Sequence, residues 1–157
     1  MTRRQLLSAF AALGLARPAT SATPARPDAL RLSEEEWRKR LTPAQFSVLR
    51  NEGTESPFSS PLNGEKRRGN YHCAGCDLAL FTSGMKFDSG TGWPSFTTAL
   101  PDAVATRTDY KLIFPRTEYH CSRCGGHQGH VFNDGPKPTG LRYCNNGVAL
   151  KFEPDGA

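Results

Sequence analysis

Between residues 69 and 152 the hydrophobic positions fall into short runs, and turn-forming residues separate each run from the next. Runs of this length and spacing are typical of an antiparallel sandwich or a small barrel, and they do not fit alternating strands and helices. The sequence therefore predicts a mainly β fold. We expect strands at residues 69–73, 78–81, 103–107, 110–114, 117–121, 129–132, 142–144 and 148–152.

Two capping motifs near the start of the chain predict two short helices. Ser33 and Glu36 form a capping box, which begins a helix that runs to about residue 39. Thr42 and Gln45 form a second capping box, with Pro43 at the first helical position, and this second helix runs to about residue 51. Four apolar residues give the helices a side that can dock on a core: Trp37, Leu41, Phe46 and Leu49.

Residues 1–22 have the order of a secretory signal, with two arginines, an apolar run and small residues up to Ala22. Arg3 and Arg4 resemble the pair of a twin-arginine signal, and an ordinary signal that happens to begin with two arginines is the alternative. We therefore predict an exported, periplasmic protein with a mobile linker at 23–32 and one domain at 33–157. The apolar run is too short to span a bilayer, so we expect no stable membrane anchor.

The composition suits a single small domain with many loops. The 157 residues include 15 glycines and 12 prolines, and hydrophobic residues make up 37% of the chain. The formal net charge is +5, and three of the positive charges, on Arg3, Arg4 and Arg17, lie in the predicted signal. The small remaining charge gives no reason to expect nucleic acid as a partner.

Four of the five cysteines form two Cys-x-x-Cys pairs, Cys73 with Cys76 and Cys121 with Cys124. Together the pairs supply the four thiolates that a tetrahedral zinc ion prefers. Because four protein ligands leave no open position, this Zn²⁺ would be structural and the chemistry would lie elsewhere. Two disulfides, which an exported protein permits, and a redox-active dithiol at one pair are the alternatives.

The fifth cysteine, Cys144, has no partner of this kind. A lone thiol is either a small buried hydrophobic residue or a nucleophile. Its neighbours Arg142, Tyr143, Asn145 and Asn146 provide charge and hydrogen-bonding groups that a buried structural cysteine does not need. We therefore favour a nucleophile.

Two other segments carry side chains that suit the walls of a pocket. Trp93 lies in a glycine-rich loop, where it could plug the core or line a cavity. His127 and His130 are three residues apart, and either one alone would more commonly be a surface or structural histidine.

Taken together and in this order, these segments resemble the methionine-R-sulfoxide reductases of the B type. The likeness runs from about residue 33 to residue 152 and includes both Cys-x-x-Cys pairs, GWPSF, GHVFNDGP and RYCxN. It implies two antiparallel sheets with short N-terminal helices and a structural zinc. It also implies reduction of methionine sulfoxide in oxidised proteins and peptides. A monomer is the default expectation.

The resemblance also implies roles for single residues. Cys144 matches the nucleophile, whose thiolate would attack the sulfoxide sulfur and be left as a sulfenic acid when methionine leaves. His127, His130 and Arg142 match polar positions that supply positive charge or the proton.

Three further positions match residues that contact the substrate. Asn146 matches a residue that helps to orient it, and Phe132 matches a binding residue. Trp93 matches the aromatic wall that packs the ε-methyl group and so selects one sulfoxide epimer.

Thr91 occupies the position at which many relatives carry a second, resolving cysteine. That thiol would close a disulfide with the nucleophile, and this chain has no sixth cysteine to do so. We therefore expect an external small thiol, or an exported thioredoxin-like partner, to attack the sulfenic acid on Cys144 directly.

Two rival interpretations belong to other classes of protein. A zinc-bearing binding module would explain the four paired cysteines but would leave Cys144 and the tryptophan and histidine loops unexplained. A hydrolase could use Cys144, His130 and Asn146 for acyl transfer. A Cys144→Ser variant separates the first rival from an enzyme, and a thioester formed with an activated ester would identify the second.

Overall fold

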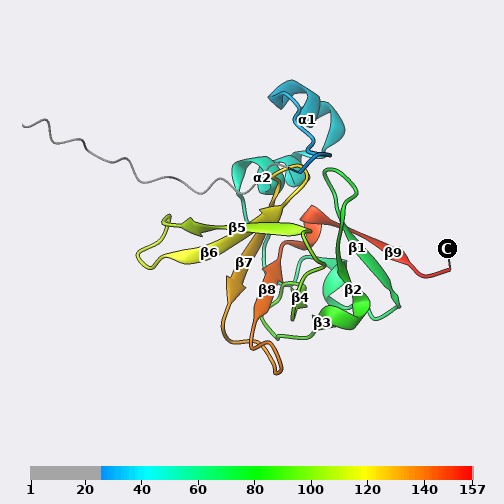
Figure 1. Ribbon diagram of the computed structural model, residues 1–157, viewed down its shortest axis with the longest axis vertical. Helices are drawn as coiled ribbons and strands as arrows, with labels where there is room; N and C mark the ends of the chain where they lie inside the picture. The colour runs from blue at the N-terminus through cyan, green and yellow to red at the C-terminus, as the bar shows by residue number, and fades with distance from the viewer. Residues whose placement is uncertain (1–25, 157) are drawn as a thin grey trace, which may run out of the picture.

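The computed structural model describes residues 26–156 (Figure 1). Within them the α-helices are α1 (Glu34–Arg40) and α2 (Pro43–Asn51), and short 3-10 helices are η1 (Pro61–Asn63), η2 (Ser83–Met85) and η3 (Gly147–Ala149). The strands are β1 (Gly69–Cys73), β2 (Ala79–Thr82), β3 (Lys86–Phe87), β4 (Ser95–Phe96), β5 (Val104–Asp109), β6 (Arg116–Cys121), β7 (His127–Phe132), β8 (Arg142–Asn145) and β9 (Leu150–Pro154). The predicted signal at residues 1–22 lies outside the described part.

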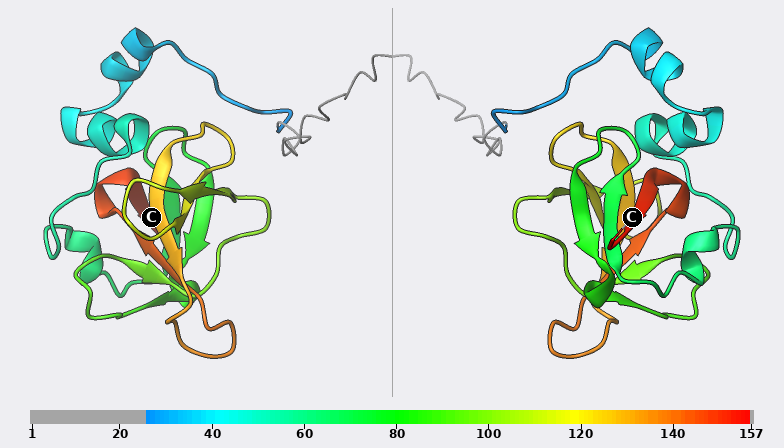
Figure 2. Two further views of the ribbon diagram at one scale, coloured as in Figure 1. Left: turned by 90° about the vertical axis from the view of Figure 1, so that its left-hand side faces the viewer. Right: turned by 90° about the vertical axis from the view of Figure 1, so that its right-hand side faces the viewer.

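The two helices begin as the capping motifs predict. Ser33 accepts a hydrogen bond from the amide of Glu36, Thr42 accepts one from the amide of Gln45, and both capping boxes are complete. The buried side chains of the helices pack into the main core, and they are Trp37, Phe46, Val48 and Leu49. The helices lie together at one end of the molecule (Figure 2). No helix within residues 26–156 has the length and apolar character needed to cross a membrane.

The described strands form two antiparallel sheets, which confirms the predicted fold class. One sheet has the order β2-β1-β9 and the other has the order β3-β4-β8-β7-β6-β5. Aromatic side chains from both sheets fill the space between them. Phe81 of β2 stacks on Phe96 of β4 with 4.0 Å between ring centroids, and Tyr119 of β6 meets Phe81 edge-on at 6.2 Å. All three side chains are fully buried, so the core is a sandwich between the sheets.

The strand predicted at residues 110–114 is wrong. These residues form the loop between β5 and β6, and Ile113 is 94% exposed. The run is rich in apolar and aromatic residues, which are common in strands because one face of a strand is usually buried. Here the hairpin extends past its last paired residues, Asp109 and Arg116, and the loop lies in solvent. The sequence prediction also omitted β3 and β4, which are only two residues each.

Part of the predicted linker is held against the domain, which corrects the expectation that residues 23–32 are mobile throughout. The guanidinium of Arg26 donates to the carbonyl of Asp102 at 2.7 Å, and the amide of Leu30 donates to the carbonyl of Arg123 at 2.8 Å. Asp28 accepts a hydrogen bond from Arg123 at 2.8 Å. The segment from Arg26 to Leu30 therefore lies along the turn that carries one of the cysteine pairs.

Candidate active site and metal centre

The four paired cysteines meet where the two sheets are joined. Cys73 ends β1 and Cys121 ends β6, and the turns that follow these strands carry Cys76 and Cys124. All four side chains are buried, and their sulfur atoms lie within 4.8 Å of one another. The structure thus brings together all four residues that the sequence analysis assigned to a metal.

The sulfur separations fit a metal ion better than disulfides. The Sγ atoms are 3.6 Å apart for Cys73 and Cys124 and 3.4 Å apart for Cys76 and Cys121. Zn–S bonds of about 2.3 Å in a tetrahedron place sulfurs about 3.8 Å apart, whereas a disulfide bond is about 2.05 Å long. All five cysteines lie within the described residues and carry free thiols. The predicted alternative of two disulfides is therefore absent from this structure.

Arginine side chains surround the cysteine cluster. Arg40 donates to the carbonyl of Gly75 at 2.7 Å, Arg50 to that of Cys124 at 2.9 Å and Arg123 to that of Cys76 at 3.1 Å. Four thiolates around a divalent ion carry a net negative charge, which nearby guanidinium groups offset. These bonds also fix the two turns, as expected for a site that orders one end of the domain.

Strand pairing places Cys144 on the outer face of the six-stranded sheet. Cys144 on β8 pairs with His130 on β7, His130 pairs with Glu118 on β6, and Glu118 pairs with Arg107 on β5. Paired residues share a face of a sheet, so these four side chains form one row. The neighbours of Cys144 on β8 alternate to the other face, where Tyr143 packs edge-on against Tyr119 in the core.

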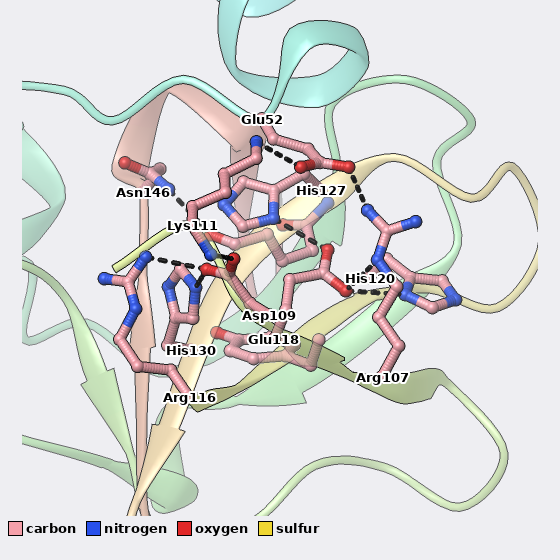
Figure 3. A network of polar contacts seen from close by, with 12 residues as sticks. Glu52, Arg107, Asp109, Lys111, Arg116, Glu118, His120, His127, His130 and Asn146 are labelled. Carbon is pink, nitrogen blue, oxygen red and sulfur yellow. Dashed lines mark hydrogen bonds and ion pairs between the residues drawn. The ribbon is translucent and has the colours of Figure 1, made fainter. Parts of the chain in front are cut away.

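Each of the two histidines is held by a carboxylate (Figure 3). The Nδ1 atom of His127 lies 2.7 Å from an oxygen of Glu118, and the Nε2 atom of His130 lies 2.7 Å from an oxygen of Asp109. Glu118 is only 2% exposed and also binds Arg107 at 3.0 Å. The histidine rings are 5.5 Å apart, so the sheet face brings together the pair that the sequence analysis singled out.

The carboxylates are ionised at neutral pH. Burial alone would raise the pKa of Glu118, but hydrogen bonds from His120 and His127 and the charge of Arg107 lower this pKa to about 2. The amide of Lys111 and the ring of His130 hold the pKa of Asp109 below its usual range. A negative charge therefore faces each histidine, and the Nδ1 contact of His127 orients that ring.

The free ring nitrogens differ between the two histidines. The Nε2 atom of His127 is buried and has no hydrogen-bond partner among the described residues. Burial lowers the pKa of His130, while the hydrogen bond to Asp109 acts in the opposite direction. Each histidine therefore has one ring nitrogen held by a carboxylate, which leaves the other ring nitrogen, Nε2 of His127 and Nδ1 of His130, for a further contact.

The Cys144 thiol is half buried, and burial raises its pKa above the usual value. The positive charge of Arg142 and a hydrogen bond from the Thr91 side chain counteract this rise in pKa. Arg142 is itself fixed by two hydrogen bonds to Asp134, at 2.8 and 2.9 Å, and its guanidinium lies 4.4 Å from the ring centroid of Phe132. The arginine is therefore the main group that favours a thiolate here.

An Arg142→Gln variant is expected to alkylate more slowly at Cys144. Removing the guanidinium raises the pKa of this thiol further, because the opposing charge is lost and Asp134 remains. The rate with iodoacetamide at pH 8 should fall by about three- to tenfold, the effect of a shift of half to one pKa unit. Rates followed against pH, with Cys144→Ser as the background, give the pKa directly.

The matched control for Arg142→Gln is Arg68→Gln, at an exposed arginine whose side chain is 91% accessible. This variant should alkylate like the wild type. Equal or faster alkylation of Arg142→Gln would show that Arg142 does not favour the thiolate.

Trp93 and Asn146 are both anchored to the segment around Glu55. The indole Nε1 of Trp93 donates to the Glu55 carbonyl at 3.1 Å, and the Asn146 side-chain oxygen accepts from the Glu55 amide at 3.0 Å. The Asn146 side-chain nitrogen donates to the carbonyl of Gln128 at 3.0 Å. Asn146 is 4% exposed, so in this structure it braces the backbone around the site.

Sequence reasoning missed the acidic residues of the site. Glu118, Asp109 and Glu55 hold the histidines and the loops, and Glu55 accepts from the amides of Gly147 and Val148 at 2.6 and 2.9 Å. Isolated acidic residues in strands and loops are usually solvent exposed, so the sequence gives no signal for these roles. Only the strand register shows that Glu118 shares a face with Cys144.

The fold and this sheet face indicate a class of protein, an enzyme with a half-buried thiol beside two carboxylate-bound histidines and a separate cluster of four cysteines that could hold a metal ion. A family model described as "SelR domain" matches residues 41–154. A peptide methionine sulfoxide reductase MsrB of Pseudomonas putida is 56% identical over 127 residues, which cover 78% of this chain and 94% of that protein. Proteins with the same name from Methanosarcina barkeri and Leptospira interrogans are 53% and 50% identical, covering 81% and 78% of this chain and 90% and 95% of theirs.

The chain belongs to the methionine sulfoxide reductase B family. This confirms the resemblance drawn from the sequence motifs and makes the protein an oxidoreductase. The binding-module and hydrolase interpretations are correspondingly disfavoured.

Proposed function

We propose that this protein reduces methionine-R-sulfoxide in proteins and peptides to methionine, with Cys144 as the nucleophile. The observation that carries the proposal is the placement of Cys144 beside His130 on the sheet face where Arg142 and the two carboxylate-bound histidines gather. A thiolate needs a neighbouring positive charge, and a departing sulfoxide oxygen needs a proton.

The reaction balances without any further reactant. The Cys144 sulfur attacks the sulfoxide sulfur while the oxygen takes up a proton, and an S–S bond forms between enzyme and substrate. The oxygen is then transferred to Cys144 as the S–S bond breaks, so methionine leaves reduced and the cysteine remains as a sulfenic acid. The proposed proton donor is one of the two histidines, whose rings lie 5.5 Å apart and which each contact a carboxylate through one ring nitrogen.

The proposed substrate-binding residues are Trp93 and Phe132. We propose that half-buried Trp93 packs the ε-methyl group, and that Phe132, under the Arg142 guanidinium, contacts the rest of the side chain. Asn146 contributes by holding the Glu55 segment and thereby Trp93. A rigid aromatic wall on one side of the sulfur is what distinguishes the two epimers.

The metal in the cysteine cluster is proposed to be a structural Zn²⁺. Cys73, Cys76, Cys121 and Cys124 would all be ligands, so no coordination site remains for substrate. When bound, the ion would hold the ends of β1 and β6 together.

Regeneration is proposed to need an external thiol. Thr91 stands where a resolving cysteine would be, and its hydroxyl is close enough to affect the Cys144 pKa. The other four thiols are buried with one another in the metal cluster. A small thiol or a thioredoxin-like protein would therefore attack the sulfenic acid, releasing water and leaving a mixed disulfide that a second thiol reduces.

We also propose that the protein is exported to the periplasm as a monomer. The support is the order of charged, apolar and small residues in 1–22, which resembles a twin-arginine signal. Export after folding would let the four thiols bind their metal before they meet an oxidising compartment.

The proposed activity is tested with a capped methionine sulfoxide that contains both epimers, using the chain without residues 1–22 and dithiothreitol as reductant. Chiral separation should show that the R epimer disappears while the S epimer remains, because the aromatic wall accepts one arrangement of oxygen and methyl group. Consumption of both epimers, or of neither by folded, metal-loaded protein, would contradict the proposal.

A further inference from the structure

The loop between β5 and β6 exposes a concentrated group of apolar side chains. Five large hydrophobic residues are strongly exposed within residues 26–156, and four of them lie in this loop. We call these four the apolar tip: Tyr110 is 77% exposed, Leu112 59%, Ile113 94% and Phe114 79%. Contiguous exposed apolar groups are uncommon on soluble proteins and usually mark an interaction site.

The two ends of the loop that carries the apolar tip are held by Asp109, which also contacts His130; Figure 3 shows Asp109 with Lys111, Arg116 and His130. Asp109, the last residue of β5, contacts His130 at 2.7 Å and also binds Arg116, the first residue of β6, at 2.7 Å. The amide of Lys111 donates to the same Asp109 at 2.9 Å, and its ammonium group pairs with Glu52. The carboxylate that holds a site histidine therefore also fixes both ends of the loop.

Strand pairing places side chains on the outer face of the six-stranded sheet in rows that lead from Cys144 toward the tip. On the outer face of the sheet the row that contains Cys144 and His130 is followed by Arg142 and Phe132, which are paired on β8 and β7. Tyr110 lies three strands across and three residues along from Cys144, so strand spacings place the start of the tip about 16–18 Å from Cys144. An extended peptide covers about 3.3–3.6 Å per residue, so about five residues bridge this distance.

We propose that the apolar tip binds apolar residues of the substrate polypeptide that lie about five positions from the oxidised methionine. The inference rests on the proposed function and specifies its substrate as loosely folded protein segments. Methionines usually lie among apolar neighbours, and oxidation makes the side chain polar and disrupts that packing. The charges at the base of the tip are paired with Glu52 and Asp109, so the tip itself presents an apolar surface that matches such a segment.

The test compares three substrates with dithiothreitol as reductant. They are capped methionine-R-sulfoxide, a peptide with leucines four to six positions from methionine-R-sulfoxide, and the same peptide with serines at those positions. For the wild type, kcat/KM should be about five- to tenfold higher for the leucine peptide than for the serine peptide, the effect of partly burying two apolar side chains. In an Ile113→Ser/Phe114→Ser variant this ratio should approach one, while activity on the capped amino acid stays unchanged.

The matched control is Ile113→Val/Phe114→Leu, which keeps the tip apolar and should keep the peptide preference. An unchanged ratio in the serine variant would overturn the inference, and so would an equal loss on all three substrates. If the serine variant turned over more slowly only with a thioredoxin-like reductant, and not with dithiothreitol, the tip would be a docking surface for the reductant and the inference would be overturned. A dimeric wild type that the serine variant converts to monomer would make it a self-association surface. Failure of the wild type on the capped substrate would instead refute the proposed function.

Discussion

A Cys144→Ser variant is expected to lose at least about a thousandfold in kcat/KM for methionine-R-sulfoxide. A serine hydroxyl is not ionised near neutral pH, and Arg142, which favours a thiolate, cannot make an alkoxide of it. The measurement is reduction of the capped R epimer with dithiothreitol. Thermal unfolding of the variant should match the wild type, because the thiol is only half buried and outside the cysteine cluster.

A single turnover without reductant tests the fate of the sulfur. The wild-type protein should gain one oxygen atom and react at Cys144 with a reagent specific for sulfenic acids, whereas Cys144→Ser should do neither. A disulfide between Cys144 and Cys73, Cys76, Cys121 or Cys124 would contradict the proposed regeneration by an external thiol. Full activity of Cys144→Ser would show that Cys144 is not the nucleophile.

A Cys121→Ser variant is expected to lose much of its stability together with its metal. One ligand fewer should cost on the order of 4 kcal/mol of the metal's contribution to folding. For a domain of this size that loss lowers Tm by roughly 8–16 °C. The measurement is thermal unfolding combined with metal analysis of the purified protein, which should find one zinc per wild-type chain.

The matched control for Cys121→Ser is Cys144→Ser, the same substitution at the cysteine outside the cluster. It should keep both the metal and the Tm of the wild type. A strong chelator should lower the Tm of the wild type toward that of Cys121→Ser. An unchanged Tm in both treatments would show that the cluster does not bind a stabilising metal.

Local motifs predicted those parts of the structure that depend on neighbouring residues in the sequence. The capping boxes predicted where both helices begin; the first ends at Arg40, one residue past its predicted end, and the second ends at Asn51 as predicted. The run after Arg68 predicted β1 with the observed bounds. The Cys-x-x-Cys spacing predicted the cluster, because a tight turn after a strand brings two thiols together.

Features that depend on the register between distant strands could not be predicted in this way. Glu118 lies opposite His130, and Asp109 reaches the same histidine from another strand, and neither residue forms a motif with its sequence neighbours. The strand predicted in the loop after Asp109 was wrong for the opposite reason. Its apolar residues have the composition of a strand, and only the end of pairing at Asp109 and Arg116 shows that they lie outside the sheet.

The position of the cysteine cluster has a consequence for the order of folding. The contacts between its two halves join residues 51 and 45 positions apart in the chain, one half from each sheet. Contacts between such distant residues form late, because the intervening chain must first be ordered. For the proposed zinc ion, a folding intermediate with only one completed sheet would offer two thiolates. Firm binding of the ion would therefore require that both sheets have formed and docked.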